Sequence, residues 1–237
     1  MELKLENISK AFGEKEVLNG AAYTFEQGKI YGLLGRNGAG KTTLFNCIAK
    51  DLLLDGGAVR LNGASNYDSQ DIGYIHTMPK LPPFLTGWEF IKYFMDMHGS
   101  RLDRSLSATD YLEKIGIARA DHDRLIRDYS HGMQNKVQMI AALMLKPAVL
   151  LLDEPLTSFD VVAAHDIKQL LLSIKSESII IFSTHILPLA QELCDEIVLL
   201  HGKRLEGIEA SRFKSADFEA EVIKWLSEDI KQAGTNS

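Results

Sequence analysis

The stretch Gly35-Arg36-Asn37-Gly38-Ala39-Gly40-Lys41-Thr42-Thr43 decides the fold, because it fits the phosphate-loop pattern of Gly, four residues, Gly, Lys and then Ser or Thr. Before it, the apolar run 30–34 predicts a buried strand, and residues 41–49 predict the helix that follows. Glycines let a backbone approach a polyphosphate and adopt positive φ, and the helix N-terminus adds unpaired N–H groups and partial positive charge. We therefore expect Lys41 to reach the β- and γ-phosphates of a nucleotide and the Thr42 hydroxyl to bind Mg²⁺. A glycine-rich turn without a ligand is the simpler alternative, but it leaves the two flanking elements unexplained.

The composition is that of a globular protein and excludes several classes. The chain has 237 residues, 46% apolar and 24% charged, enough for one large α/β domain or two small ones. Its formal net charge of −6 leaves no basic surplus, so no nucleic-acid partner is expected. The two cysteines, Cys47 and Cys194, fall in predicted helices, which indicates a reducing cytoplasm rather than a disulfide framework. The N-terminus lacks a signal-peptide core, and no apolar run approaches the roughly 18 residues of a membrane span.

The order of the expected elements predicts a mixed or parallel sheet with flanking helices. Strands are expected early in the chain, around the phosphate loop, and again near its end, at residues 3–8, 17–25, 30–34, 58–61, 71–75, 148–152, 179–182 and 197–200. Helices at 161–174 and 187–194 alternate with the later strands in the βαβ rhythm of a parallel sheet. The early strands predict an N-terminal antiparallel β region.

Two further segments have a helical texture. Residues 79–145 carry apolar side chains at helical spacing and predict an inserted helical subdomain. Residues 217–231 place apolar side chains on one helical face: Phe218, Val222, Trp225, Leu226 and Ile230. We expect this helix to pack back on the domain rather than to dock on a partner. The predicted division is one domain over 1–215, followed by a C-terminal helix and tail over 216–237.

A second motif is the apolar run 148–152, which ends in Asp153 and Glu154. A buried strand delivers such side chains into the ligand crevice at the carboxyl edge of an α/β sheet. Asp153 is expected to hold Mg²⁺, and Glu154 to act as the general base toward the attacking water. A strand that merely ends in solvated acids is common, but beside a phosphate loop that interpretation is weaker.

The third motif is Tyr129-Ser130-His131-Gly132-Met133, directly before a helix, where Ser130 can cap the helix and Gly132 leaves the backbone bare. With this motif in place, the chain resembles the ATP-binding-cassette (ABC) ATPases over residues 1 to about 210. The signature Leu-Ser-Gly-Gly-Gln of that family reads here as residues 129–133. The resemblance implies a phosphate-loop NTPase core, ATP and Mg²⁺ as cofactors, and ATP hydrolysis.

The resemblance also assigns roles to single residues. Phe12 stands where the family stacks an aromatic side chain on adenine. Ser130 and Gly132 would contact the γ-phosphate of ATP bound to a second subunit, and Ser158 and Asp160 match the loop that crosses the dimer interface. His185, after the strand 179–182, matches the histidine that contacts the γ-phosphate and the attacking water.

Two positions depart from the family pattern. Thr77 stands where the family has a glutamine after the strand that precedes the helical insert, and it could reach Mg²⁺ or the water only if its loop lies closer. His131 replaces a signature glycine and adds bulk and a possible proton beside the phosphate. We expect slower or partner-dependent hydrolysis, because Lys41, Asp153 and Glu154 are intact.

The function that the resemblance implies is the ATPase subunit of a membrane transporter, cytoplasmic and peripheral on the inner face of the membrane. Two such subunits, identical or different, would close around two ATPs and drive a separate integral-membrane permease. The Leu85–Phe90 stretch and Met133 resemble bacterial export-type systems. A soluble ABC ATPase that clamps ribosomes or DNA is the alternative, but the chain has one cassette, no heptad run and an acidic balance. A GTPase is disfavoured, because Asn135-Lys136 lacks the acidic residue of the guanine-binding motif.

Overall fold

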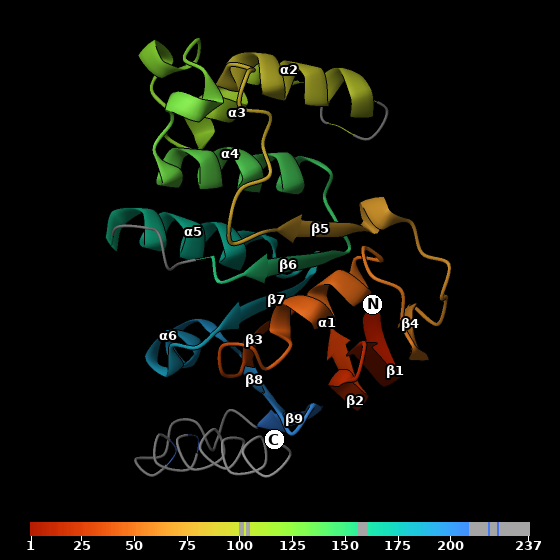
Figure 1. Cartoon of the computed structure of the whole chain (residues 1–237). Coiled ribbons are helices and arrows are strands. Elements are labelled where there is room, and N and C mark those ends of the chain that lie inside the picture. Colours follow the sequence, from red (N-terminus) through yellow and green to blue (C-terminus); the bar gives the residue numbers. More distant parts are fainter. Residues whose placement is uncertain (100–101, 103–104, 156–160, 209–217, 219–221, 223–237) are drawn as a thin grey trace.

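The computed structural model describes residues 1–99, 102, 105–155, 161–208, 218 and 222, with only the backbone described over 161–167. Figure 1 shows two sheets in the lower part of the molecule and a group of helices above them. Within the described residues, no helix combines the length and the apolar content that crossing a bilayer requires. The phosphate loop lies in the lower part, and the Tyr129–Met133 motif lies in the upper part.

The first sheet is antiparallel and comes from the front of the chain. It has the order β2-β1-β4, built from β1 (Glu2–Phe12), β2 (Lys15–Glu26) and β4 (Gly56–Leu61). Alternate side chains of β1 are buried, including Leu3 and Leu5, as expected of a strand that has one face on a core.

The second sheet carries the site. Its order is β5-β6-β7-β3-β8-β9. Of the first four strands of the chain, only β3 belongs to this sheet, where it is a central strand. Its strands are β3 (Ile30–Leu34), β5 (Ile72–Ile75), β6 (Val149–Asp153), β7 (Ile179–Thr184), β8 (Glu196–His201) and β9 (Arg204–Ile208). Every residue of β3, β6 and β7 is buried, which explains their continuous apolar sequence. The five strands from β5 to β8 are parallel, and β9 is antiparallel to β8.

Helix α1 (Lys41–Ile48) lies between the two sheets. Its buried side chains Leu44, Phe45 and Ile48 share one apolar cluster with residues of both sheets. The phosphate loop is therefore held at its C-terminal end by a helix that cannot shift without disturbing the main core.

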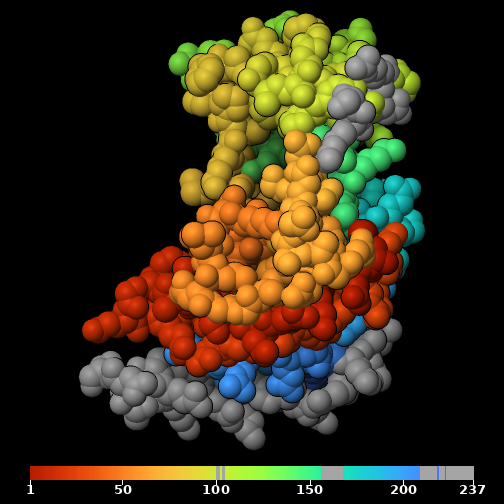
Figure 2. All heavy atoms as spheres, turned by 90° about the vertical axis from the view of Figure 1, so that its right-hand side faces the viewer, coloured from red at the N-terminus to blue at the C-terminus, as the bar shows by residue number. Residues whose placement is uncertain are grey.

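The helical part contains α2 (Gly87–His98), α3 (Ala108–Lys114) and α4 (His131–Met144), with short 3₁₀ helices at Arg119–Asp121 and Ile126–Asp128; a further one, Ser69–Asp71, precedes β5. Thr86 and Ser107 form capping boxes at the starts of α2 and α3. These helices have a core of their own, in which Ile91, Leu112 and Val137 are fully or almost fully buried. Figure 2 shows this part at the top of the molecule, joined to the lower part through a narrower band of atoms.

The remaining helices cover the other face of the main sheet. Helices α5 (Val161–Ile174) and α6 (Leu187–Leu193) follow β6 and β7, and Leu171 and Leu193 pack with Met139 of α4 against the sheet. Phe218 and Val222 are buried against β8, β9 and α6, as the packed interpretation of the C-terminal segment expects. Trp225, Leu226 and Ile230 lie outside the described residues.

The predicted α/β fold, its antiparallel N-terminal region and its helical insert are confirmed. Strand β9 was not predicted: it is a short hairpin partner of β8, and only two of its residues are apolar. The division at residue 215 stays a prediction.

Candidate nucleotide-binding site

The phosphate loop joins β3 to α1, and two of its glycines have backbone angles that other residues rarely adopt. Gly38 and Gly40 have φ angles of 83° and 109°. A Cβ atom on Gly40 would also lie 2.8 Å from Cγ1 of Val17, so β2 leaves no room for one. At Gly35 a Cβ atom would lie 3.1 Å from the carbonyl oxygen of Leu200. Gly38 and Gly40 therefore turn the loop, whereas Gly35 lets it pass close to β8.

Lys41 is held inside this loop. Its side chain is only 6% exposed, and Nζ donates to the carbonyl oxygens of Gly35 at 2.7 Å and Arg36 at 3.3 Å. The same Nζ lies 3.4 Å from Oε1 of Glu154. The ammonium stands at the first residue of α1, where the helix dipole adds positive potential. This arrangement attracts the phosphates of a nucleotide.

A chain of hydroxyl and carboxylate contacts joins α1, β6 and β7. The Thr42 hydroxyl donates to Oδ2 of Asp153 at 2.7 Å, and the buried Ser183 hydroxyl donates to Oδ1 at 2.6 Å. Both oxygens of the Asp153 carboxylate therefore have partners. Ser183 and Asp153 lie opposite each other in the parallel pairing of β6 and β7. The sequence predicted both Thr42 and Asp153 as Mg²⁺ ligands, and the structure brings their side chains together.

Glu154 follows directly and has an unusual backbone. Its φ is 52°, in the left-handed region, and its N–H donates to the Ser183 hydroxyl at 3.0 Å. Nδ1 of His185 lies 3.0 Å from Oε2 and 3.1 Å from Oε1 of the Glu154 carboxylate. Non-glycine residues in this region carry a conformational cost and are concentrated at functional sites. The turn directs Glu154 toward Lys41 and His185, the two groups predicted to act with it.

Lys41, Thr42 and the two carboxylates line an open cavity of about 470 Å³ at the carboxyl edge of the main sheet. Phe12, at the end of β1, lines it with the phosphate loop and both carboxylates, and the residue is 49% exposed. Nζ of Lys10 lies 5.6 Å from the centre of the Phe12 ring. The volume is within the range of small-molecule sites, and an exposed aromatic face is available for a base to stack on.

Thr77 lies close to the metal-binding candidates. Its hydroxyl donates to the backbone carbonyl oxygen of Asp153 at 2.9 Å, so the loop after β5 is already against the end of β6. A direct bond from Thr77 to Mg²⁺ stays a prediction. Nearby, burial raises the pKa of Tyr74, and the Asp153 carboxylate adds to that rise.

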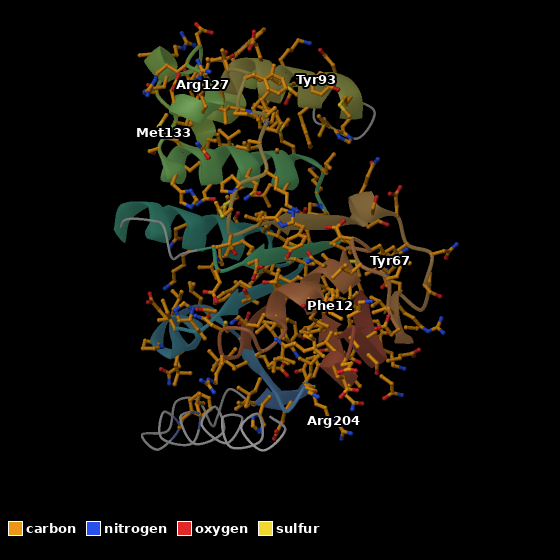
Figure 3. The ribbon with its side chains drawn as sticks, viewed as in Figure 1. Phe12, Tyr67, Tyr93, Arg127, Met133 and Arg204 are labelled. Carbon is orange, nitrogen blue, oxygen red and sulfur yellow. The ribbon has the colours of Figure 1, made fainter. Side chains whose placement is uncertain are left out.

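The signature residues lie in the helical part. Ser130 caps α4, and its Oγ accepts from the Met133 N–H at 3.2 Å. Ser130 and His131 are exposed and Gly132 is half-buried. Figure 3 shows Met133 among the helices and Phe12 beside the N-terminal sheet, well separated from each other. Within the described part of the chain, no hydrogen bond or ion pair joins Ser130 or Gly132 to the phosphate loop. Ser158 and Asp160 lie outside the described residues.

The oxygen atoms of Thr42 and Asp153 suit Mg²⁺. This ion usually takes one or two protein oxygens and fills its remaining positions with water and substrate phosphates. A hydroxyl and a carboxylate in contact at the cavity wall match that pattern. The described residues contain no group of three or more His, Cys, Asp or Glu that could hold a metal ion.

Three residues of the site were missed by the sequence reasoning. Ser183 was not assigned a role, although a serine that ends an apolar strand just before His185 is a signal for the carboxyl edge of the sheet. Lys15 and Val17 line the cavity beside Phe12. They come from β2, and nothing in their sequence pattern indicates that β2 reaches the phosphate loop.

A phosphate loop after a central strand, paired carboxylates at the end of β6 and a cavity between them define a P-loop nucleoside triphosphatase. The pattern of the ABC transporter family matches residues 18–157, more than half of the chain. The chain belongs to this family, as one of its ATP-binding ATPase chains. The predicted resemblance is confirmed.

Individual proteins agree with this assignment. The uncharacterized ABC transporter ATP-binding protein YdbJ of Bacillus subtilis is 32% identical over 205 residues, which cover 84% of this chain and 66% of that protein. The bacitracin transport ATP-binding protein BcrA of Enterococcus faecalis is 32% identical over 207 residues, with 84% and 66% covered. The chain thus spans about two thirds of the length of these curated relatives.

A solved structure supports the fold. It is a dimeric ATP-binding cassette in a post-hydrolysis state with bound ADP and Pi, and it has a TM-score of 0.76 and 20% identity. The comparison covers 88% of this chain and 98% of that one. At this identity the likeness concerns the fold.

Proposed function

We propose that the chain is the ATP-hydrolysing subunit of an ABC exporter. Two such chains, or this chain and a different cassette, close around two ATPs and drive a separate integral-membrane permease. The subunit is cytoplasmic and lies on the inner face of the membrane. Each ATP contacts the phosphate loop of one chain and the α4 N-terminus of the other.

The observation that carries this proposal is the separation of the two phosphate-binding features within one chain. In Figure 1 the arrowheads of β5, β6 and β7 point to the left, and α4 begins on the same side. Ser130 is exposed there, and the first N–H groups of α4 make an anion site. A second copy turned by a two-fold axis would bring its Ser130 over the Lys41 cavity. The solved cassette of the same fold is described as a dimer.

The chemistry follows from the contacts around Glu154. A bound Mg²⁺ would be held by Thr42 and Asp153, and it would neutralise charge on the phosphates. Lys41 stabilises the charge that develops on the β- and γ-phosphates. The oxygen of a water forms a bond to the γ-phosphorus while the bond to the bridging oxygen breaks, and ADP leaves. Glu154 accepts the proton of that water, and His185, bound to the Glu154 carboxylate through Nδ1, orients it.

The permease partner is supported by large apolar side chains that are exposed on α2 and in the loop before it. Trp88, Tyr93 and Met97 of α2 are 39%, 59% and 59% exposed, and Phe84 in the preceding loop is 72% exposed. Figure 3 shows Tyr93 on α2, at the end of the molecule away from the N-terminal sheet. Tyr93 and Met97 are four residues apart and share one face of α2, and such an exposed apolar pair suits burial against another protein.

The direction of transport is supported by the named relatives. BcrA is described as a bacitracin transport protein, and another relative, 30% identical with 84% of this chain covered, is the linearmycin resistance ATP-binding protein LnrL of B. subtilis. A transport protein that confers resistance to a compound must move that compound out of the cell, so the name of LnrL favours export.

The proposal is tested with the Glu154→Gln variant, which keeps the shape of the side chain but removes the base. We expect steady-state ATP turnover to fall at least about 100-fold, the range for loss of a general base, while ATP binding persists. Slow hydrolysis should trap the closed dimer, so addition of ATP should double the mass measured by light scattering. Pull-down of the tagged chain from detergent-solubilised membranes should recover an integral-membrane protein.

Two results would contradict it. Unchanged turnover in Glu154→Gln would refute the assignment of the base. Recovery of soluble partners alone, together with a monomer at saturating ATP, would refute the transporter subunit.

A further inference from the structure

A buried glutamine connects the signature helix to the loop beside the metal-binding candidates. Gln138 lies on α4 and is 8% exposed. Its Nε2 donates to the carbonyl oxygen of His76 at 3.0 Å, and its Oε1 accepts from the N–H groups of His76 at 3.4 Å and Lys80 at 3.5 Å. One side-chain amide therefore serves three backbone groups of the loop that follows β5.

The next residue of that loop continues the connection. Thr77 is adjacent to His76, and its hydroxyl donates to the backbone carbonyl oxygen of Asp153 at 2.9 Å. The His76 ring lies against the Tyr74 ring with their centroids 3.9 Å apart. The path from α4 to the end of β6 thus contains two hydrogen-bonded side chains and one peptide unit.

Direct packing accompanies this path. Asn135 and Met139 of α4 line a narrow pocket together with Thr77 and Glu154, and the pocket has no room for a water molecule. Side chains that enclose a space too small for water lie near one another, and protein interiors transmit strain. A shift of α4 is therefore expected to act on the loop, on the end of β6, or on both.

We propose that Gln138 and Thr77 are positioning residues that transmit the placement of α4 to Asp153 and Glu154. Gln138 lies eight residues after Ser130, or about 12 Å along the helix. Because both residues belong to one helix, a movement of the Ser130 end of α4 also moves the Gln138 amide. When Ser130 engages the nucleotide of the opposite chain, α4 is fixed, and the two side chains set the end of β6 for hydrolysis. The inference rests on the proposed roles of Asp153 and Glu154.

The chemistry of an amide explains why this position holds a glutamine. Two N–H groups and one carbonyl oxygen of the loop face α4 at this point. An amide supplies a donor and an acceptor at once, whereas an apolar side chain supplies neither. The three hydrogen bonds of Gln138 therefore set the distance between the loop and α4.

The test uses Gln138→Met, which keeps the length of the side chain without its polar atoms, and Thr77→Val, which removes the hydroxyl at nearly constant shape. We expect each variant to lower kcat about tenfold with KM for ATP changed less than about twofold, because the interaction matters at the hydrolysis step. Thr77→Ser, which restores the hydroxyl, should recover most of kcat. The double variant should be no slower than the slower single variant, because both changes interrupt one path.

Two controls separate positioning from general damage and from metal binding. Val137→Ala disturbs α4 on its other face, inside the helical core, and should lower stability in urea with kcat nearly unchanged. The Mg²⁺ concentration for half-maximal activity should be the same in Thr77→Val and in the parent chain. If Gln138→Met does not fold, Thr77→Val, Thr77→Ser and the Mg²⁺ titration decide the question.

The outcomes distinguish this inference from the proposed function. Unchanged turnover in Glu154→Gln refutes the proposed function itself. Loss of turnover in Glu154→Gln with normal kcat in Thr77→Val and Gln138→Met refutes only the positioning role. An equal fall of kcat in Val137→Ala, additive effects in the double variant, or a higher Mg²⁺ requirement in Thr77→Val also refutes it.

Discussion

The phosphate-binding region and the start of α4 both present groups suited to phosphate, but they differ in how many partners they find within the chain. In the first region Lys41, Thr42, Asp153 and Glu154 contact one another or the loop backbone. At the start of α4, Ser130 caps its own helix and is otherwise exposed. The difference shows that the first region is assembled by folding alone; on the proposed function, the second would act on a ligand carried by another chain.

The largest expected effect tests this division by mixing two inactive variants. Lys41→Ala removes the ammonium of the loop, and Ser130→Glu places a negative charge where a phosphate would lie. Each variant alone should have almost no ATPase activity. Mixed dimers contain one site with an intact Lys41 and an intact Ser130, so an equal mixture should recover about one quarter of the parent activity for statistical pairing of identical chains.

The measurement is phosphate release as a function of mixing ratio, with Arg127→Ala, an exposed residue of the helical part, as a control that keeps activity. No recovery at any ratio, although the parent chain is active alone, would show that both features act within one chain.

A smaller effect is expected from Ser183→Ala, inside the region that folding completes. The hydroxyl accepts from the N–H of Glu154 and donates to Asp153 in a fully buried position. Its removal leaves a buried N–H without this partner and should cost about 1–3 kcal/mol of the free energy of unfolding. ATP turnover should fall, because the Asp153 carboxylate and the Glu154 backbone each lose a positioning contact, while ATP still binds.

Urea unfolding and ATP turnover measure the two quantities. Ser173→Ala, which removes an exposed hydroxyl on α5 that bonds only the nearby Leu170 carbonyl among the described residues, should change neither by much. Equal effects of the two serine variants would contradict a special role for Ser183.

The smallest effect concerns Cys47 on α1, whose burial raises its pKa from about 9 to about 11. Between these values the unfolded chain releases the thiol proton and the folded chain keeps it, so the free energy of unfolding falls as the pH rises from 9 to 11. The contribution is roughly 2 kcal/mol over that window. Cys47→Ala lacks it, so the difference in stability between the parent and the variant should narrow as the pH rises. If the free energies of unfolding of the parent chain and of Cys47→Ala changed with pH in the same way, the burial of the Cys47 thiol on α1 would be contradicted.

Sequence reasoning succeeded where chemistry is local and failed where strands from distant parts of the chain meet. The phosphate loop, Asp153 and Glu154 could be found because their residue types must stand in a fixed order. The contact of Ser183 with Asp153 depends on the pairing of β6 with β7, and the sequence of neither strand predicts that pairing. Likewise, Gln138 resembles any polar residue on a helix until α4 is packed beside β5. The left-handed turn at Glu154 could not be expected, because the preference of glutamate opposes it.

The contacts of Lys41 have a consequence for how quickly ATP can be accepted. Since the ammonium already holds the carbonyl groups of Gly35 and Arg36, the loop keeps its curvature before any nucleotide arrives. A preorganised receptor loses little conformational entropy on association. Capture of ATP should then need no slow rearrangement of the loop, and under the proposed function the meeting and parting of whole chains would set the pace of the cycle.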